Sequence, residues 1–434
     1  MTIRFRHRGA QVFLEESQSL PVVDLVFRFG GGSLSDPEGQ GGLTRVTGRL
    51  LRRGTRQIPA AEVDARIAEL GARLSVTISR SALALQGSVL ARNVEPFVAL
   101  VASLLREPAF RGSDLSRAKR RIKASLLALR DDDYGLASRH LQRHIFGEHP
   151  YSRPSGGTHA SIGRLRRADL LAQHEQLWCA GNLTLGAAGA ITEAELRDLL
   201  TRHFGDVPRG RAVRPTLRTP KMAPGRRLLI VDKRDRTQTQ LGVATLGIRA
   251  TDSVYMPFLV ADAAFGGMFT SRLMQAVRAE RGWSYSAYSS FGAGRQRDAW
   301  RMWTHPSTGH ARDCLALQLD LLQAWAEGDH RGDEVRRAKR YLRGSRCFDE
   351  DTAFRRLEVA MSVAELKQSD EHLGGFRKAI GRVTLRQTKE AVRQHIKPSK
   401  LALVAVGDAR ELAPSLGSLP GIRDVKVVPY DARL

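Results

Sequence analysis

An arginine and a tyrosine in the second half of the chain, Arg278 and Tyr285, have side chains and a spacing that could support chemistry. Residues 270–281 have the pattern of a helix, Gly282 is a natural C-cap, and residues 283–291 alternate as a strand does. This arrangement brings the end of the helix and the start of the strand toward the same place. A guanidinium and a phenolic O–H can both stabilise an oxygen on which negative charge develops. Without other context, the pair would be a surface arginine and a core tyrosine.

A second candidate is the segment 41–55, GGLTRVTGRLLRRGT, which has the pattern of a short helix that follows a double glycine and ends at Gly54. Arg45 and Arg49 are four residues apart, so they lie on one helix face, as two metal ligands on a helix would. A guanidinium stays protonated at physiological pH and has N–H donors but no acceptor. These arginines therefore cannot ligate a metal ion.

Histidines offer an alternative metal site. His140 and His144 are also spaced i, i+4, and Glu148 or His149 could be a third ligand. No glutamate lies between the two histidines to act as a general base. Histidines on an amphipathic helix are more often packed or partly exposed, and the sequence favours that structural interpretation.

The elements that position these residues occur twice. Residues 162–185, IGRLRRADLLAQHEQLWCAGNLTL, and 380–403, IGRVTLRQTKEAVRQHIKPSKLAL, share Ile-Gly-Arg followed by a helix, a short break and an apolar strand. Earlier in each half, a predicted strand (22–31 or 239–249) leads to a double glycine, Gly41–Gly42 or Gly266–Gly267, that we expect to open a helix. The chain therefore contains two copies of one unit.

A proline-containing stretch separates the two copies. We predict an N-terminal domain at 1–207, an extended linker at 208–227 and a homologous C-terminal domain at 228–434. The predicted fold class is α+β, with each domain a mainly antiparallel sheet covered by helices.

Local patterns in the first half predict two strands and two helices. The strands are 73–79, with apolar residues in alternation, and 82–90. The helices are 93–106, with Asn93 as N-cap, and 113–130, which begins at Ser113.

The composition restricts the class of protein. The 434 residues are 42% hydrophobic and 26% charged, which is ordinary for a globular protein, and no apolar run approaches the length of a membrane span. No signal peptide is visible in this numbering, so we expect a cytoplasmic or periplasmic protein.

Three widely spaced cysteines give no disulfide framework or zinc motif. The net charge of +24 has no accompanying nucleic-acid motif, so nucleic acid is not the favoured partner.

The two α+β halves, the helix after the double glycine near residue 42, and the segments FGEHPYSRPSGGTHASI (146–162) and GGMFTSRLMQAVRAERGWSYSAYSS (266–290) together resemble the pitrilysin/insulinase/mitochondrial processing peptidase family of zinc peptidases. The resemblance covers nearly the whole chain. It implies a fold in which the two domains form half of a clamshell.

The resemblance places GLTRVTGRLLRRGT where the family has H-x-x-E-H followed by Gly-Thr. Arg45 and Arg49 then occupy the two histidine positions and Gly48 the position of the glutamate base. The family's third ligand, a glutamate on the long downstream helix, is expected near Ala124 or Ser125, and no acid occurs between Asp114 and Asp131. We therefore expect no zinc and no other cofactor in this chain.

In the resembled family, an arginine and a tyrosine at the spacing of Arg278 and Tyr285 hold the substrate backbone and stabilise the oxyanion at the zinc of the other half. Arg281, Ser284 and Tyr288 could substitute if the register is displaced. The resemblance thus implies a non-catalytic subunit of a bacterial heterodimeric metalloendopeptidase, without zinc peptidase activity alone. Its partner would carry H-x-x-E-H and the zinc, and unfolded peptides would be the substrates.

Within this family, the non-catalytic subunit of the mitochondrial enzyme carries a long glycine-rich loop, and FGGMFTSRL is too short to be that loop. Two other classes stay open. One is a purely structural relative, like the core subunits of respiratory complexes, and the other is a basic nucleic-acid-binding protein.

Overall fold

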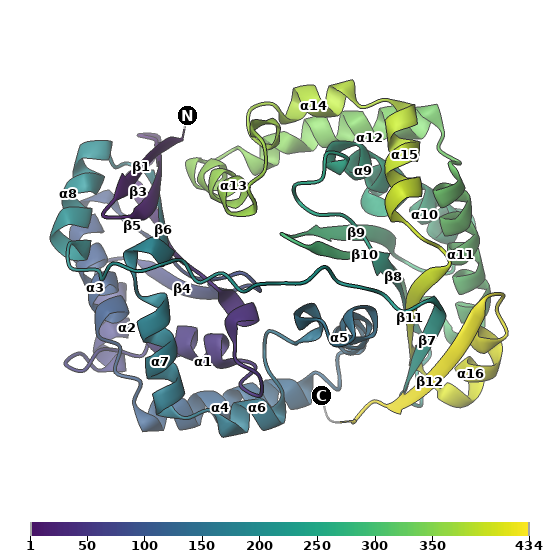
Figure 1. Ribbon diagram of the computed structural model, residues 1–434, viewed down its shortest axis with the longest axis horizontal. Helices are drawn as coiled ribbons and strands as arrows, with labels where there is room; N and C mark the ends of the chain where they lie inside the picture. Colours follow the sequence, from purple (N-terminus) through teal and green to yellow (C-terminus); the bar gives the residue numbers. More distant parts are fainter. Residues whose placement is uncertain (1, 433–434) are drawn as a thin grey trace.

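The computed structural model describes residues 2–432, which form two halves that lie side by side. Each half is a six-stranded mixed sheet covered by helices (Figure 1). The α+β architecture predicted from the sequence is therefore confirmed.

The elements of the first half alternate between strands and helices. Its strands are β1 (Ile3–His7), β2 (Ala10–Glu16), β3 (Val22–Gly30), β4 (Arg73–Ile78), β5 (Ala82–Leu90) and β6 (Leu183–Gly189). Its helices are α1 (Leu43–Leu51), α2 (Ala60–Glu69), α3 (Val94–Arg106), α4 (Gly112–Ala128), α5 (Asp133–Phe146), α6 (His159–Arg164), α7 (Arg167–Leu177) and α8 (Glu193–Phe204).

The second half follows the same sequence of elements. Its strands are β7 (Gly225–Asp232), β8 (Gln240–Leu246), β9 (Ala287–Ala293), β10 (Arg297–Thr304), β11 (Lys400–Gly407) and β12 (Ile422–Pro429). Its helices are α9 (Tyr255–Asp262), α10 (Arg272–Met274), α11 (Ala311–Glu327), α12 (Gly332–Ser345), α13 (Ala353–Leu366), α14 (Phe376–Arg382), α15 (Leu385–His395) and α16 (Ala409–Gly417).

The two sheets share one topology. Their strand orders are β1-β2-β6-β3-β5-β4 and β12-β7-β11-β8-β10-β9. β2 and β6 are parallel, as are β7 and β11, and the next three pairings in each sheet are antiparallel. Only the far edge differs, because β1 joins antiparallel to β2 and β12 joins parallel to β7. The repeat seen in the sequence is therefore a repeat of fold, with β4 and β9 as equivalent edge strands.

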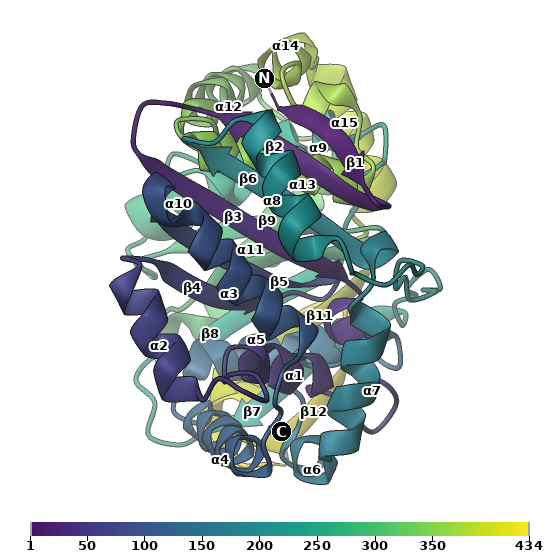
Figure 2. The same cartoon turned by 90° about the vertical axis from the view of Figure 1, so that its left-hand side faces the viewer.

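Each sheet buries both faces, and its own helices cover one of them. Figure 2 shows α3 and α8 lying across the strands of the first sheet. In β11, Leu401, Leu403 and Ala405 belong to the core under the helices of the second half, whereas Val404 and Val406 belong to a separate core on the opposite face. Successive side chains of a strand point to opposite faces, so the continuous apolar run in β11 is the pattern of a strand covered on both sides.

The opposite face of the second sheet is covered by a helix from the first half. α5 packs against β8 and β11, and its Leu141 and Phe146 share a core with Val404 and Trp303 (Figure 1). This core joins residues that are more than 150 positions apart in the chain.

The second half returns the same contact to the first. α13 packs against β2 and β6, and its Leu357 and Met361 share a core with Phe13, Val26 and Ala188. The equivalent helices α5 and α13 each cover the sheet of the other half. Each half therefore needs the other to bury both faces of its sheet.

Residues 208–224, in the region predicted as a linker, form no helix or strand and cross the molecule between the halves (Figure 1). β7 begins at Gly225, three residues before the predicted start of the second domain.

Several predicted boundaries need correction. Gly42, with φ 90°, does precede α1, but Gly266 and Gly267 end a π-helical turn, and Ser271 is the N-cap of α10. Gly266 lies against β9, where a Cβ would be 2.5 Å from the backbone nitrogen of Ser289, so this position requires glycine. The strand expected at 283–291 begins only at Ala287.

Of the two helix starts predicted in the first half, one is confirmed and the other is displaced by one residue. Asn93 is the N-cap residue of α3, as predicted, but its side-chain amide donates to the Leu70 carbonyl and makes no capping hydrogen bond. α4 begins at Gly112 after Arg111, without a side-chain cap.

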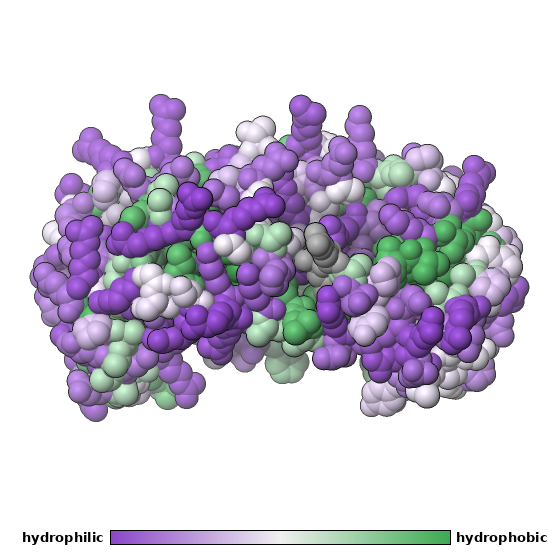
Figure 3. Space-filling view, turned by 90° about the horizontal axis from the view of Figure 1, so that it is seen from below, coloured by the Kyte–Doolittle hydropathy of each residue, from purple (hydrophilic) through white to green (hydrophobic). Residues whose placement is uncertain are grey.

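Hydrophilic side chains predominate over both halves on the face seen in Figure 3. No helix among residues 2–432 is long and apolar enough to cross a membrane.

Candidate substrate-binding site

Arg278 and Tyr285 come together at a tight reversal of the chain. Arg278 lies in a π-helical turn, Gln275–Ala279, that continues α10, and Gly282 follows with φ 65°. The N–H groups of Gly282 and Trp283 donate to the carbonyls of Arg278 and Val277, at 3.0 and 3.1 Å. These bonds close the helix end and return Tyr285 over it. A π-helical turn is rare and occurs often at functional sites.

The guanidinium of Arg278 lies close to two aromatic rings. Its Cζ is 4.4 Å from the ring centroid of Tyr285 and 4.9 Å from that of Phe269. Both rings are largely exposed, Tyr285 at 76% and Phe269 at 66%. Among the described residues, the side chain of Arg278 makes no hydrogen bond or ion pair. We call Phe269, Arg278 and Tyr285 the arginine–aromatic stack.

The two rings orient the Arg278 guanidinium but accept no hydrogen bond from its N–H groups. Stacking on aromatic faces holds a planar guanidinium in place and leaves the N–H groups at its edge available. The Tyr285 phenol is likewise exposed. The arrangement can therefore bind an anionic or carbonyl oxygen supplied from outside the chain.

The three alternatives are engaged within the chain. Arg281 donates to the Ala276 carbonyl and pairs with Glu280. Ser284 is buried, and its hydroxyl donates to the Ser286 carbonyl. The Tyr288 hydroxyl donates to Tyr134, and burial together with that neighbour raises the pKa of Tyr288. None of them presents free donors as the stack does.

A buried carboxyl supports the strand that follows the stack. Asp262 Oδ1 accepts hydrogen bonds from Ser289 Oγ of β9 (2.6 Å) and from Trp300 Nε1 of β10 (2.7 Å). Complete burial raises the pKa of Asp262 to about 6. Neither Asp262 nor Phe269 was predicted from the sequence, because only the fold brings them to Ser289 and Arg278.

The equivalent region of the first half is positively charged. Arg45 and Arg49 lie on α1, which packs against α4, the helix that carries Arg121. Partial burial, Arg45 and Arg121 lower the pKa of Arg49, in that order of effect. Arg45 Nη1 lies directly over Gly156, where a Cβ would be 2.4 Å away. No acid among the described residues pairs with these three arginines.

The core leaves no room for a side chain at Gly48, the residue at the position of the family's glutamate base. A Cβ at Gly48 would lie 2.7 Å from Leu83 Cδ1 and 3.1 Å from Val76 Cγ1. At the expected third ligand, Ala124 and Ser125 are exposed residues of α4 without a carboxylate. The residues present therefore do not fit a zinc ion of the family type.

The histidines do not form a metal site either. His144 Nε2 and His149 Nε2 lie 3.0 and 2.9 Å from the carbonyls of Arg227 and Arg218, so each nitrogen donates a hydrogen bond and has no lone pair for a metal. Burial and two neighbouring arginines lower the pKa of His140 to about 4. Within residues 2–432, no three His, Cys, Asp or Glu side chains are grouped to hold a metal ion.

Comparisons with known proteins agree with this fold. Residues 11–159 match the family model "Insulinase (Peptidase family M16)", and residues 164–342 match "Peptidase M16 inactive domain". An uncharacterised zinc protease of Mycobacterium leprae is 27% identical over 77% of this chain and 76% of its own length. A protein of Helicobacter pylori named non-peptidase homolog YmxG is 24% identical over 92% of both chains.

Solved structures show the same fold. The M16 inactive domain from Pseudomonas fluorescens superposes with a TM-score of 0.87 at 24% identity, covering 94% of this chain and 98% of that one. The first half of the periplasmic protease PqqL from Escherichia coli gives a TM-score of 0.79 at 13% identity, over 95% and 93%. The family models, the repeated fold and the relatives agree, and the chain belongs to the insulinase (M16) family of peptidases.

Proposed function

We propose that this chain is the non-catalytic subunit of a two-subunit zinc peptidase. In this pair, Arg278 and Tyr285 contact the peptide bound at the zinc of the partner subunit. The arginine–aromatic stack is the observation that carries the proposal. It exposes two large rings and an arginine that has no partner among residues 2–432, which folding alone does not require.

The zinc of the partner would polarise the scissile carbonyl. As the tetrahedral intermediate forms, the carbonyl oxygen gains negative charge, and the Arg278 N–H groups and the Tyr285 O–H donate hydrogen bonds toward it. Because stacking already orients Arg278, little side-chain entropy is lost when the oxyanion forms.

An edge strand gives the substrate a place to lie. β9 ends its sheet and begins two residues after Tyr285, so an extended peptide added to this edge would pass the stack. Main-chain hydrogen bonds along an edge give affinity with little demand on sequence. The net charge of +24 favours acidic or mixed peptides, and equal cleavage of acidic and basic peptides at low salt would contradict that preference.

The test is to purify this chain with a similar-sized partner that carries H-x-x-E-H and to measure peptide hydrolysis. Arg278→Ala and Tyr285→Phe should each lower kcat about 100-fold or more, as loss of one oxyanion donor does. Arg281→Ala is the matched control, because Arg281 bonds within its own turn, and it should change kcat less than about threefold.

Two results would overturn the proposal. One is chelator-sensitive hydrolysis by this chain alone. The other is unchanged turnover of both variants in a complex that assembles normally. Unchanged turnover would support a second candidate, a structural relative without a peptidase role, which is favoured by the fold shared with a chain of Complex III2 from Candida albicans (TM-score 0.77, 15% identity, 94% and 97% coverage).

A further inference from the structure

A cavity of about 650 Å³ lies between the two halves, away from the arginine–aromatic stack. Its walls come from the ends of β2, β3 and β6, from linker residues 210–217, from the end of α13, and from the turn between β9 and β10. This volume is within the range of pockets that bind small molecules, about 300 to 1,000 Å³.

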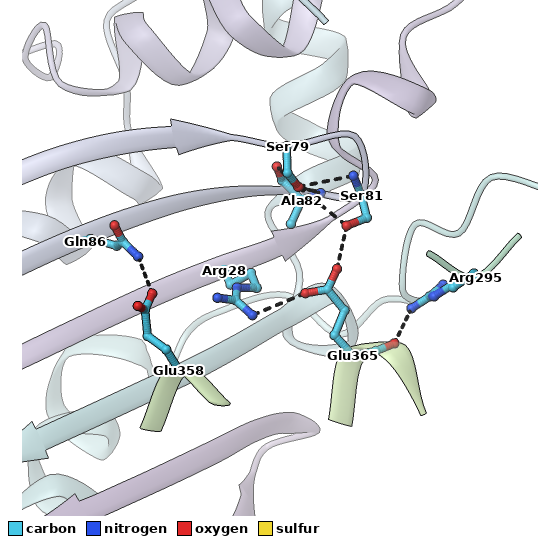
Figure 4. Close-up of polar contacts among 8 residues, drawn as sticks. All are labelled: Arg28, Ser79, Ser81, Ala82, Gln86, Arg295, Glu358 and Glu365. Atoms are coloured by element: carbon cyan, nitrogen blue, oxygen red, sulfur yellow. Dashed lines mark hydrogen bonds and ion pairs between the residues drawn. The ribbon is translucent and has the colours of Figure 1, made fainter. Parts of the chain in front are cut away.

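The walls are fixed by contacts across the halves. In Figure 4, Arg28 of the first sheet pairs with Glu365 of α13 (3.2 Å), and Arg295 donates to the Glu365 carbonyl. The linker is held by a hydrogen bond from the Val213 N–H to Asn182 Oδ1 (2.8 Å). The cavity is therefore a built feature of the fold.

The lining is strongly basic. Seven cationic side chains and two carboxylates line the cavity. The cations are Arg6, Arg28, Arg80, Arg211, Arg214, Arg295 and Lys367, and the acids are Asp298 and Glu365. Both acids already have partners, because Asp298 pairs with Arg80 at 2.8 Å and Glu365 with Arg28.

The side chains of four lining cations make no hydrogen bond or ion pair with residues 2–432. They are Arg6, Arg211, Arg214 and Lys367. Apolar and aromatic residues complete the lining, among them Phe13, Leu34, Leu217 and Met361. Several uncompensated cations beside an apolar wall match an organic molecule with more than one negative group.

We propose that this cavity binds a small organic anion that carries at least two phosphate or carboxylate groups. Arg211 and Arg214 of the linker contact the anionic groups from one side, and the first sheet and α13 enclose the rest. A ligand there bridges both halves and fixes their relative position. The inference does not depend on the peptidase role.

The probes are ADP and citrate, with adenosine as the uncharged comparison, and calorimetry measures binding to the intact chain at constant low ionic strength. ADP, citrate or both should bind, and adenosine should not. ADP binding alone would identify phosphate as the ligand chemistry, and citrate binding alone would identify carboxylate.

Linker substitutions locate the binding site. Arg211→Gln with Arg214→Gln should weaken the anion at least tenfold. Arg218→Gln removes the same charge from the same linker outside the cavity, and it should change the affinity less than twofold. These exposed side chains make no hydrogen bond or ion pair within the described part of the chain that the substitutions would remove, so the folded structure should be unaffected. An unchanged Tm of the free chain would confirm this. Absence of binding to both anions, or equal weakening by the lining and control variants, would overturn the proposal.

Discussion

The helix α1 and the turn that carries Arg278 occupy equivalent places in the two halves. Each follows a buried acid and a double glycine, and each precedes the edge strand of its sheet, β4 or β9. In the first half, Asp36 accepts hydrogen bonds from the N–H groups of Gly42 and Thr44 and fixes the start of α1. In the second half, Asp262 binds the edge strand and its neighbour instead.

The two places have diverged in what surrounds them. Around α1, the core has closed over Gly48 and the ligand positions have become arginines that repel one another. Around Arg278, the rings of Phe269 and Tyr285 are exposed, and the guanidinium has no polar partner among the described residues. In the first half this segment is packed into the scaffold, whereas in the second half it presents the exposed rings of Phe269 and Tyr285 beside Arg278.

Substitution of two arginines of the same segment should distinguish most clearly between a structural role and exposure to an external molecule. Arg272 is buried and pairs with Glu334 (2.6 Å) and Asp329 (3.0 Å). Arg272→Ala should lower the free energy of unfolding by about 3 to 5 kcal/mol, because two carboxylates lose their cation and one of them is buried. Arg278→Ala should change it by less than about 0.5 kcal/mol. Urea unfolding measures both, and a large loss for Arg278→Ala would make the stack structural.

The buried acid behind β9 should make stability depend on pH. With its pKa raised to about 6, Asp262 keeps its proton in the folded chain at pH values where the unfolded chain, near 3.8, has lost it. The folded state then binds more protons, so its stability falls as pH rises from 4 to 6 and levels off above that. The expected loss is roughly 2 to 3 kcal/mol.

Asp262→Asn keeps the acceptor oxygen for Ser289 and Trp300 and should remove this loss. Urea unfolding at pH 4, 5, 6 and 7 measures it, with the exposed Asp320→Asn as control. An Asn variant with the full pH dependence of the wild type would show that Asp262 does not carry the proton.

Filling the place of the lost glutamate should disrupt the core. Gly48→Ala should destabilise the chain by about 1 to 2 kcal/mol, because the added methyl meets Leu83 and Val76. Gly344→Ala, in α12, meets no atom within 4 Å and should stabilise by up to about 1 kcal/mol through helix propensity. Thermal unfolding of the two variants gives the comparison. If both changes stabilise, the space for a catalytic base is still open.

The smallest effect should come from the arginines of α1. Arg49→Gln relieves repulsion with Arg45 and Arg121 and should stabilise the chain by about 0.2 to 0.5 kcal/mol at low salt. The gain should vanish at 1 M salt, where charges are screened within about 3 Å. Unfolding midpoints at both salt concentrations test this. A loss of stability at low salt would mean that Arg49 has a stabilising contact.

Much of the architecture was accessible from the sequence because it depends on local pattern. The repeat of Ile-Gly-Arg, helix and apolar strand predicted α7 and β6, and their equivalents α15 and β11. The spacing of Arg278 and Tyr285 around Gly282 predicted their approach, which the structure shows as a stack. The role of the pair in a peptidase is still a prediction.

What the sequence missed involves contacts between distant segments. The amphipathic pattern of α5 shows that one face is buried, but it does not show that the face lies on the sheet of the other half. The double glycine at 266–267 looks locally like the one at 41–42, but it ends a π-helical turn and does not open a helix. The sequence pattern also did not show that the Phe269 ring lies against Arg278.

By itself, the sequence determined that α1 cannot hold zinc, because no arrangement of neighbours makes a guanidinium a ligand. It also determined the two-copy plan, since helix and strand periodicities are properties of short stretches. Only the tertiary structure decided that the two halves exchange a helix, that Gly48 is closed by the core, and that a basic cavity lies between the halves. Those features arise where separate segments meet, and their distances depend on the packing of the whole chain.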